Sequence, residues 1–282
     1  MNSSTPGSPE SALTTFDDAL ALQANGDGCF LADIAEGWDV RGNPHGGYLL
    51  ALVTRAMSQV VTQPDPLTVS ATYLAPPRFG QAQLQVRVLR AGRRQSTTSV
   101  RLIQDDIERV NAVATFGTLG DEPPECYAAE LASPPPLPPP EDCLSTELIN
   151  QAEGMIIRLH ERLELRLHPD TGWIVGRPSG RAELHGWLRH RGRDPDPLAL
   201  LMFSDGMPPS LFEAVGRGAV HTPTVQLTTH LFSRPEPGWV QGYFRTRLSA
   251  GGFLDEDGEL WDATGKLVAT TRQLALLRTW ES

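Results

Sequence analysis

The sequence lacks the features that mark membrane, secreted and metal-binding proteins. No apolar run approaches the roughly 20 residues that cross a bilayer, and residues 1–10 hold neither the basic nor the apolar segment of a secretory signal. The three cysteines are Cys29, Cys126 and Cys143, and none stands at the short spacing of a metal site. We therefore expect a cytoplasmic protein with free thiols, no bound metal and no association with a membrane.

Signs of nucleic-acid binding and of the common hydrolase mechanisms are missing as well. Asp and Glu total 34 against 24 Lys and Arg, a net charge of −10, whereas proteins that bind phosphate backbones present a basic surface. The sequence contains no Gly-x-Ser-x-Gly elbow, no His-Glu-x-x-His, no phosphate-binding loop and no dinucleotide-binding glycine motif. We therefore expect no nucleic-acid partner and no cofactor, and a serine hydrolase of the α/β type is unsupported.

What the sequence does contain is two short segments that are almost wholly apolar. Residues 48–57 follow a loop rich in glycine, at 41–47, and residues 198–205 end in one carboxylate, Asp205, before Gly206. A helix without a polar face is a buried helix, so both segments are predicted to be interior helices. Burying an unpaired carboxylate costs several kcal/mol. Asp205 therefore serves either as a hydrogen-bonded acid at a helix end or in chemistry.

A run of four predicted strands follows each apolar helix. The first run is predicted at residues 67–74, 81–90, 95–103 and 108–116, and the second at 224–232, 239–249, 252–261 and 266–277. Residues 81–89 alternate polar and apolar, as a half-buried antiparallel strand does. Two further helices are predicted at 17–23 and 144–155, and three further strands at 30–38, 156–167 and 180–190. Short words also recur, such as Thr72-Tyr-Leu-Ala-Pro in the first half and Thr229-His-Leu-Phe-Ser-Arg-Pro in the second.

This repeated order predicts an internal duplication of an α+β unit. A curved antiparallel sheet wrapped around one helix buries that helix on all sides, and the sequence holds two such units. Between them, residues 121–142 are too rich in proline for a sheet interior and predict an extended connector. We expect a tail at 1–27, a first unit at 28–120, a linker at 121–143 and a second unit at 144–282.

Six motifs, in this order and spacing, resemble one family. They are Gly42-Asn-Pro-His-Gly-Gly47, Ala71-Thr-Tyr-Leu-Ala-Pro76, Phe203-Ser-Asp205, Pro223-Thr-Val-Gln-Leu-Thr228, Phe232-Ser-Arg-Pro235 and Thr271-Arg-Gln273. The chain resembles acyl-CoA thioesterases of type II, and more closely the bacterial thioesterase-like double-hotdog proteins, over about residues 28–120 and 155–278. The resemblance implies a double hotdog fold, an acyl-CoA substrate and a homo-oligomer, a dimer or larger.

The resemblance also implies a catalytic trio from the second half: an Asp on the helix, a hydroxyl on the next strand and a Gln on the last strand. These positions are Asp205 and Gln273, with Thr224 as the hydroxyl if the strand is aligned on its hydroxyl–aliphatic–Asp–x–hydroxyl pattern. Alignment on Phe-Ser-Arg-Pro without a gap places Val225 there instead. We prefer Thr224, with Thr228 as a substrate-binding neighbour on the same strand face. The family often has Asp in the middle of this motif, where the present chain has Gln.

The first half contributes a loop but no acid. His45, Gly46 and Gly47 are similar to the His-Gly-Gly loop of single-hotdog thioesterases, which carry an acid further along the following helix. Thr54 takes that place here. Because the second half has the acid without the loop, we infer one composite site per chain, with His45, Gly46 and Gly47 binding the substrate.

These residue types suit the hydrolysis of a thioester. A carboxylate can accept the proton of a water molecule that an amide and a hydroxyl hold in line. The expected function is a thioesterase that hydrolyses acyl-CoA, or a related acyl thioester, to free acid and thiol. The altered strand motif also permits a non-catalytic acyl-CoA-binding or scaffold protein, while a hydratase is disfavoured because no His lies near Asp205 in sequence. Asp255-Glu-Asp257 is interpreted as an exposed hairpin turn.

Overall fold

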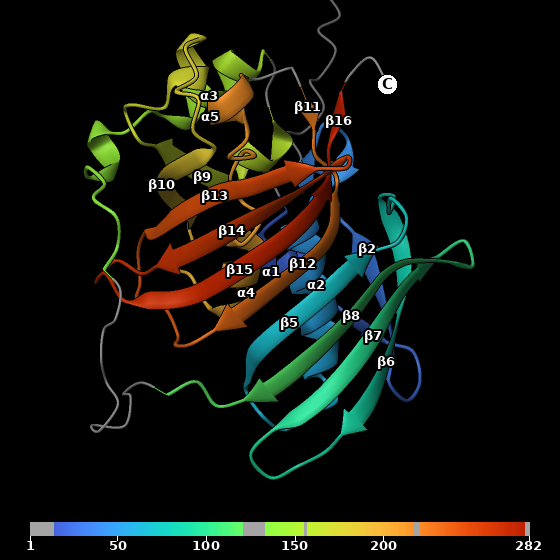
Figure 1. Ribbon diagram of the computed structural model, residues 1–282. Helices are drawn as coiled ribbons and strands as arrows, with labels where there is room; N and C mark the ends of the chain where they lie inside the picture. The colour runs from blue at the N-terminus through green and yellow to red at the C-terminus, as the bar shows by residue number, and fades with distance from the viewer. Residues whose placement is uncertain (1–13, 121–132, 155–156, 217–219, 280–282) are drawn as a thin grey trace, which may run out of the picture.

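The structure is a computed structural model, and it describes residues 14–120, 133–154, 157–216 and 220–279. Twelve antiparallel strands form one sheet in the order β1-β2-β6-β7-β8-β5-β12-β15-β14-β13-β10-β9. The order on one side of the β5–β12 junction is the mirror image of the order on the other side, with β8 corresponding to β15, β7 to β14 and β6 to β13. This confirms the predicted duplication and the α+β double hotdog (Figure 1).

The first half contains two helices and eight strands in the described residues. They are α1 Phe16–Ala19, β1 Gln23–Ala24, β2 Cys29–Ile34, β3 Asp39–Val40, β4 Asn43–Pro44, α2 Gly46–Ser58, β5 Asp65–Tyr73, β6 Gly80–Arg90, β7 Ser96–Gln104 and β8 Ile107–Gly117. The four long strands agree with the sequence prediction to within two residues at each end. Helix α1 is shorter than the predicted helix at 17–23.

The second half repeats the arrangement, with three 3₁₀ turns and a further helix inserted before its central helix, α4. Its elements are the 3₁₀ turns at Pro140–Asp142, Arg158–Glu161 and Gly172–Val175, the helices α3 Thr146–Glu153, α4 Pro197–Phe203 and α5 Phe212–Val215, and the strands β9 Leu163–Leu167, β10 Glu183–His190, β11 Val220–His221, β12 Thr224–Leu231, β13 Val240–Ala250, β14 Phe253–Trp261, β15 Leu267–Leu276 and β16 Arg278–Thr279. The strand predicted at 156–167 is shorter than expected, because a 3₁₀ turn occupies its first part.

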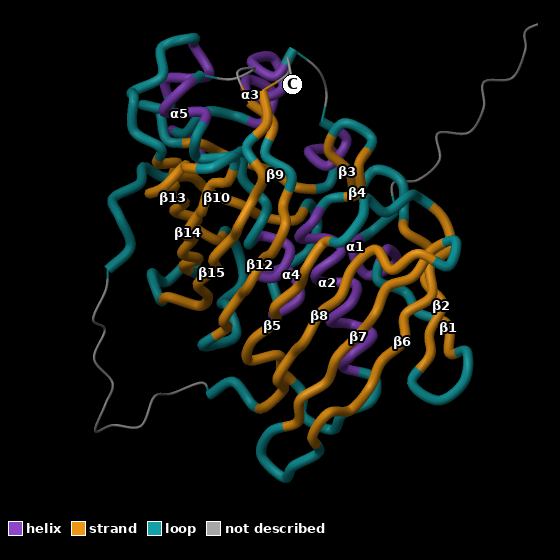
Figure 2. The backbone as a smooth tube through the Cα atoms, turned by 45° about the vertical axis from the view of Figure 1, so that its right-hand side comes forward, coloured by secondary structure: helices purple, strands orange, loops and turns teal. Residues whose placement is uncertain are grey.

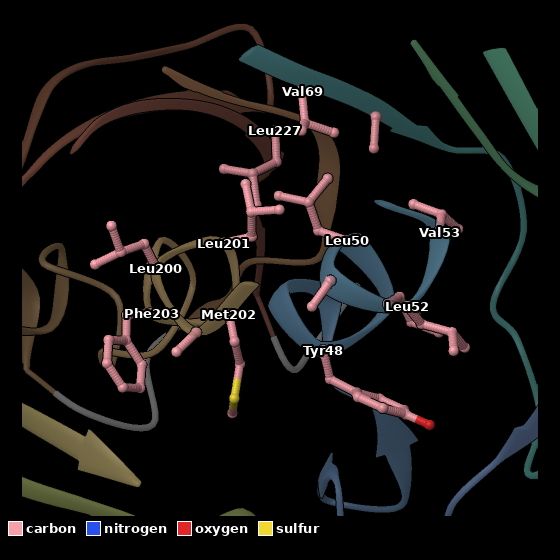
Figure 3. Close-up of a cluster of buried hydrophobic side chains, with 14 of the residues drawn as sticks. Tyr48, Leu50, Leu52, Val53, Val69, Leu200, Leu201, Met202, Phe203 and Leu227 are labelled. Carbon is pink, nitrogen blue, oxygen red and sulfur yellow. The ribbon is translucent and has the colours of Figure 1, made fainter. Parts of the chain in front are cut away.

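Helices α2 and α4 lie side by side within the curve of the sheet (Figures 1 and 2). Helix α2 begins where the His45 side chain caps it by accepting a hydrogen bond from Tyr48 N, and α4 begins where Asp196 accepts one from Ala199 N. Leu50 of α2 and Leu201 of α4 point toward β5 and β12, where these strands join the two halves (Figure 3). Each such buried leucine contributes about 1.5–3 kcal/mol by leaving water.

The two segments expected to be loose are held by the fold where they are described. Phe16, Ala19 and Leu20, within the expected tail, are buried in the core, so the ordered unit begins earlier than residue 28. In the proline-rich segment, Trp187 Nε1 donates to the Pro138 carbonyl at 2.8 Å and Gln241 Nε2 to the Pro135 carbonyl at 2.7 Å. The connector therefore lies against β10 and β13, while residues 121–132 and Cys126 are outside the described residues.

Two further expectations concerned the cysteines and membrane-spanning segments. Cys29 and Cys143 are free thiols. Among the helices described, none is both long enough and apolar enough to cross a membrane.

Candidate active site

Asp205 lies at the meeting point of the two helices, just beyond the end of α4. Its Oδ2 accepts a hydrogen bond from Gly47 N at the start of α2, at 3.0 Å. The N-terminus of a helix carries a partial positive charge, which favours a carboxylate there. The side chain keeps 17% of its surface exposed, so the carboxylate is anchored without being sealed off. The acid of the second half is thus in contact with the loop of the first half, as the hypothesis of a composite site requires.

Gln273, on β15, links the acid to the strand hydroxyl. Its Nε2 donates to Asp205 Oδ1 at 3.1 Å and also to Thr224 Oγ1. A carboxylate can only accept, so the amide must turn its NH₂ group toward Asp205. Both N–H bonds of Gln273 are then used, and its Oε1 remains as an acceptor. The structure brings together all three residues of the predicted trio, from three different elements.

A β-bulge decides which residue of β12 reaches this site. Leu227 and Thr229 point into the core, so counting back by two places Val225 on the inner face. However, β12 advances two residues, from Gln226 to Thr224, while β15 advances one. The extra residue turns Thr224 inward beside Gln273. This bulge corresponds to the one-residue gap that separated the two alignments of the strand.

Thr228 lies on the opposite face of the same strand. Its Oγ1 is 2.8 Å from Ser70 Oγ on β5, and Gln226 Nε2 donates to the same Ser70 hydroxyl at 3.4 Å. Its neighbours Leu227 and Thr229 face inward. The prediction that Thr228 shares the face of Thr224 is therefore wrong, because it assumed a strand without a bulge. On this outer face Thr228 is outside the site, and the substrate-binding role expected for it is corrected accordingly.

Both ring nitrogens of His45 are engaged with backbone groups. Its Nδ1 accepts from Tyr48 N at 3.3 Å, and its Nε2 lies 2.7 Å from the Asp205 carbonyl oxygen. Since a carbonyl only accepts, Nε2 carries the proton and the ring is fixed in that tautomer. No ring nitrogen is left for a substrate, which corrects the substrate-binding role expected of His45. The ring instead ties the α2 N-terminus to the backbone at Asp205.

Gly46 and Gly47 allow the two helices to approach each other closely. A Cβ on Gly47 would lie 2.3 Å from the Met202 carbonyl oxygen, and one on Gly46 would lie 2.6 Å from Asp205 Oδ2. The N–H groups of Gly47, Tyr48 and Leu49 are all engaged. Gly46 is partly exposed, and its N–H has no partner in the described part of the chain, so this group remains available as a hydrogen-bond donor at the helix N-terminus.

Tyr73, at the end of β5, was not among the predicted site residues. Its hydroxyl donates to the Gly46 carbonyl at 2.7 Å. Burial, with a further contribution from the nearby charge of Asp205, raises the pKa of Tyr73 well above its usual value, so it stays a neutral donor. Period-two counting along β5 from the buried Val69 and Ala71 would have placed Tyr73 on the inner face.

A second carboxyl near the site was also missed. Glu256 is in the middle of β14 and only 8% exposed, which shows that the interpretation of Asp255-Glu-Asp257 as an exposed hairpin turn is wrong. Counting by two between Leu254 and Leu260 turns Glu256 inward. Burial raises the pKa of Glu256 to about 7, hydrogen bonds from Ser210 oppose the rise, and the charge of Asp205 adds to it.

The fold and this composite site define a class: a double-hotdog protein in which a carboxylate, an amide and a hydroxyl converge beside a helix N-terminus. Two family descriptions match the chain, the acyl-CoA thioesterase N-terminal domain over residues 34–117 and the acyl-CoA thioesterase C-terminal domain over residues 140–277. The chain therefore belongs to the acyl-CoA thioesterase family. Together these matches cover both halves and leave out most of the proline-rich linker.

Three proteins are similar to this chain over most of its length. An uncharacterised protein of Mycobacterium tuberculosis is 30% identical over 273 residues, covering 88% of this chain and 90% of its own. A protein of Thermobifida fusca, provisionally named a thioesterase II, is 28% identical with a TM-score of 0.83 and covers 95% of this chain and 98% of its own. A hotdog protein of unknown function from Alicyclobacillus acidocaldarius, 23% identical with a TM-score of 0.81, covers 94% and 98% and supports the fold alone.

Proposed function

We propose that the protein hydrolyses acyl-CoA, or a related acyl thioester, to the free acid and the thiol, with Asp205, Thr224 and Gln273 activating the attacking water. The observation that carries the proposal is the double hydrogen bond of the Gln273 amide, which joins Asp205 to Thr224. These hydrogen bonds join a proton acceptor to two groups that can orient water. Membership of the acyl-CoA thioesterase family supports a thioester as the substrate.

The hydrogen-bonding atoms left over by these contacts suit one water molecule. The Thr224 hydroxyl accepts from Gln273 and can still donate its own hydrogen to the water oxygen, while Gln273 Oε1 can accept one water hydrogen. The second water hydrogen passes to the Asp205 carboxylate as the oxygen attacks the thioester carbonyl carbon. Held in this way, the water is oriented before reaction, which lowers the entropic part of the barrier.

Two negative charges form during the reaction, one on the thioester oxygen and one on the leaving thiolate. As the water attacks, electrons move onto the carbonyl oxygen, and the free Gly46 N–H at the start of α2 can stabilise that oxyanion. The C–S bond then breaks and the thiolate leaves. A thiol has a pKa of about 8.5, so the thiolate needs little help, and it takes the proton that Asp205 received from water.

The test is release of free thiol from acetyl-, octanoyl- and palmitoyl-CoA by the purified chain and its variants. Asp205→Asn removes the proton acceptor and is expected to lower kcat by about 10²–10⁴-fold, the usual contribution of a general base. Gln273→Ala loosens the water and is expected to cost about 10²-fold. Gln226→Ala, on the exposed outer face of β12, is the matched control and should retain the wild-type rate.

Two results would contradict the proposal. Hydrolysis that survives both substitutions in well-folded protein would place the chemistry elsewhere. Saturable binding of acyl-CoA by the wild-type chain, with thiol release no faster than in buffer, would instead indicate a non-catalytic acyl-CoA-binding protein. Thermal melting of each variant distinguishes loss of chemistry from loss of folding.

A further inference from the structure

Glu256 is a buried carboxyl for which the proposed water activation has no task. Its Oε2 accepts two hydrogen bonds from Ser210, one from the backbone N at 2.8 Å and one from Oγ at 2.5 Å. The Ser210 hydroxyl is itself 3.0 Å from Thr246 Oγ1 on β13. No cation in the described residues pairs with Glu256. Burying an ionised acid without a cation costs free energy. Such a group is therefore either held neutral or retained because it has a function.

The position of Glu256 connects it to the proposed catalytic trio. In the antiparallel pairing of β14 with β15, Glu256 is directly opposite Gln273, and both side chains point to the inner face, Glu256 being buried and Gln273 reaching Asp205. Directly opposite residues have their Cβ atoms about 4.5–5.5 Å apart. Gln273 in turn donates to Asp205. Glu256 therefore lies behind the amide that links Asp205 to Thr224.

The groups that face Glu256 come from three elements. The loop after α4 supplies Ser210 and Asp205, β13 supplies Thr246, and β15 supplies Gln273. Of these, Asp205 is the charged group, and its charge acts on Glu256. The charged residues next along the strands are paired on the outer face, where Arg247 binds Asp257 and Arg272 binds Asp255.

We propose that Glu256 is a positioning residue of the Asp205 site, a carboxyl tethered by Ser210 behind Gln273, whose negative charge helps to drive the proton of the attacking water onto Asp205. This inference rests on the proposed function. During attack, negative charge leaves Asp205 and builds on the thioester oxygen beside Gly46 N–H, on the α2 side. Because Glu256 lies on the opposite, β15 side of Asp205, ionised Glu256 repels the charge that leaves more than the charge that forms.

The experiment is the pH dependence of kcat for acyl-CoA hydrolysis. Burial raises the pKa of Glu256 to about 7, so the wild-type rate should rise through an inflection near neutral pH. If only the ionised form is fast, kcat changes by about tenfold per pH unit below that inflection. Glu256→Gln keeps the shape of the side chain but cannot ionise. The inflection should disappear, leaving kcat constant within about twofold between pH 6 and 8.

A second variant tests the tether without removing the carboxyl. Ser210→Ala deletes the hydroxyl donor to Glu256 Oε2, a bond that favours the ionised form. The inflection should therefore move to higher pH while the maximal rate is retained. The matched control is Asp255→Asn, which removes a carboxylate one residue away on the outer face and should leave the pH profile of the wild type unchanged.

The outcomes separate this inference from the function on which it rests. An unchanged inflection in Glu256→Gln, or an inflection that stays in place or falls in Ser210→Ala, overturns the role of Glu256 while leaving hydrolysis intact. If the wild-type chain releases no thiol from any acyl-CoA, the proposed function fails and takes this inference with it. Should Glu256→Gln fail to fold, as shown by thermal melting, the direction of the shift in Ser210→Ala still decides.

Discussion

Gly46 lies so close to Asp205 that adding one methyl group at residue 46 should displace the carboxylate. A Cβ built on Gly46 would lie 2.6 Å from Asp205 Oδ2 and 3.5 Å from the Tyr73 hydroxyl. Unstrained contacts between such atoms lie at roughly 3.5 Å, so Gly46→Ala must push the carboxylate away by about 1 Å. The substitution removes no hydrogen-bonding group, because alanine keeps the backbone N–H and C=O.

The expected effect on rate is large and the expected effect on folding is small. Displacing a reacting group by about 1 Å can cost 10²-fold in rate, so kcat for thiol release should fall by about that factor. Gly46 is the first residue of α2, where alanine is at least as favourable as glycine, by up to about 1 kcal/mol in a helix interior. The melting temperature should therefore stay the same or rise slightly.

The neighbouring glycine supplies the comparison. A Cβ on Gly47 would lie 2.3 Å from the backbone oxygen of Met202, which cannot turn away as a side chain can. Gly47→Ala must separate α2 from α4 and should lower both the stability, by about 1–3 kcal/mol, and the rate. If Gly46→Ala hydrolyses acyl-CoA at the wild-type rate with an unchanged melting temperature, the carboxylate is not where the reaction takes place and the reasoning fails.

Three further predictions concern other parts of the site and of the core. Thr224→Val should lower kcat by about tenfold or more, whereas Thr228→Val should leave it unchanged, because only the first hydroxyl reaches Gln273. Tyr73→Phe removes the donor to the carbonyl of Gly46 and should lower kcat several-fold, with a loss of about 0.5–1.5 kcal/mol in urea unfolding. Burial lowers the pKa of His190 to about 3, so below about pH 6.5 the unfolded chain takes up a proton that the folded chain does not. Folding stability should then fall on acidification by up to about 1.4 kcal/mol per pH unit, and His190→Leu should lose about 2 kcal/mol less than the wild type between pH 7 and pH 5 in urea titrations.

Local patterns in the chain were sufficient for most of the fold. The two apolar segments became α2 and α4, and the period-two segments became the long strands, because burial of a helix or a strand face depends on residues close in sequence. The prediction of a composite site followed from the resemblance of local motifs to those of thioesterases, since each half lacked what the other half carried. Glu256 could have been placed inward by the same counting, from Leu254 and Leu260, but its charged neighbours suggested a turn.

The sequence by itself indicated the repeated α+β units through local periods, and its motifs, through their resemblance to one family, indicated the double hotdog, the acid at 205 and the glutamine at 273. Only the tertiary structure decided that Thr224 rather than Val225 faces the site, since the bulge in β12 is set by pairing with β15, a strand more than forty residues away. It also decided that His45 caps α2 and bonds the backbone at Asp205. Hydrogen bonds between distant residues depend on strand register and on helix packing. Neither of these can be deduced from the residue pattern of a single segment.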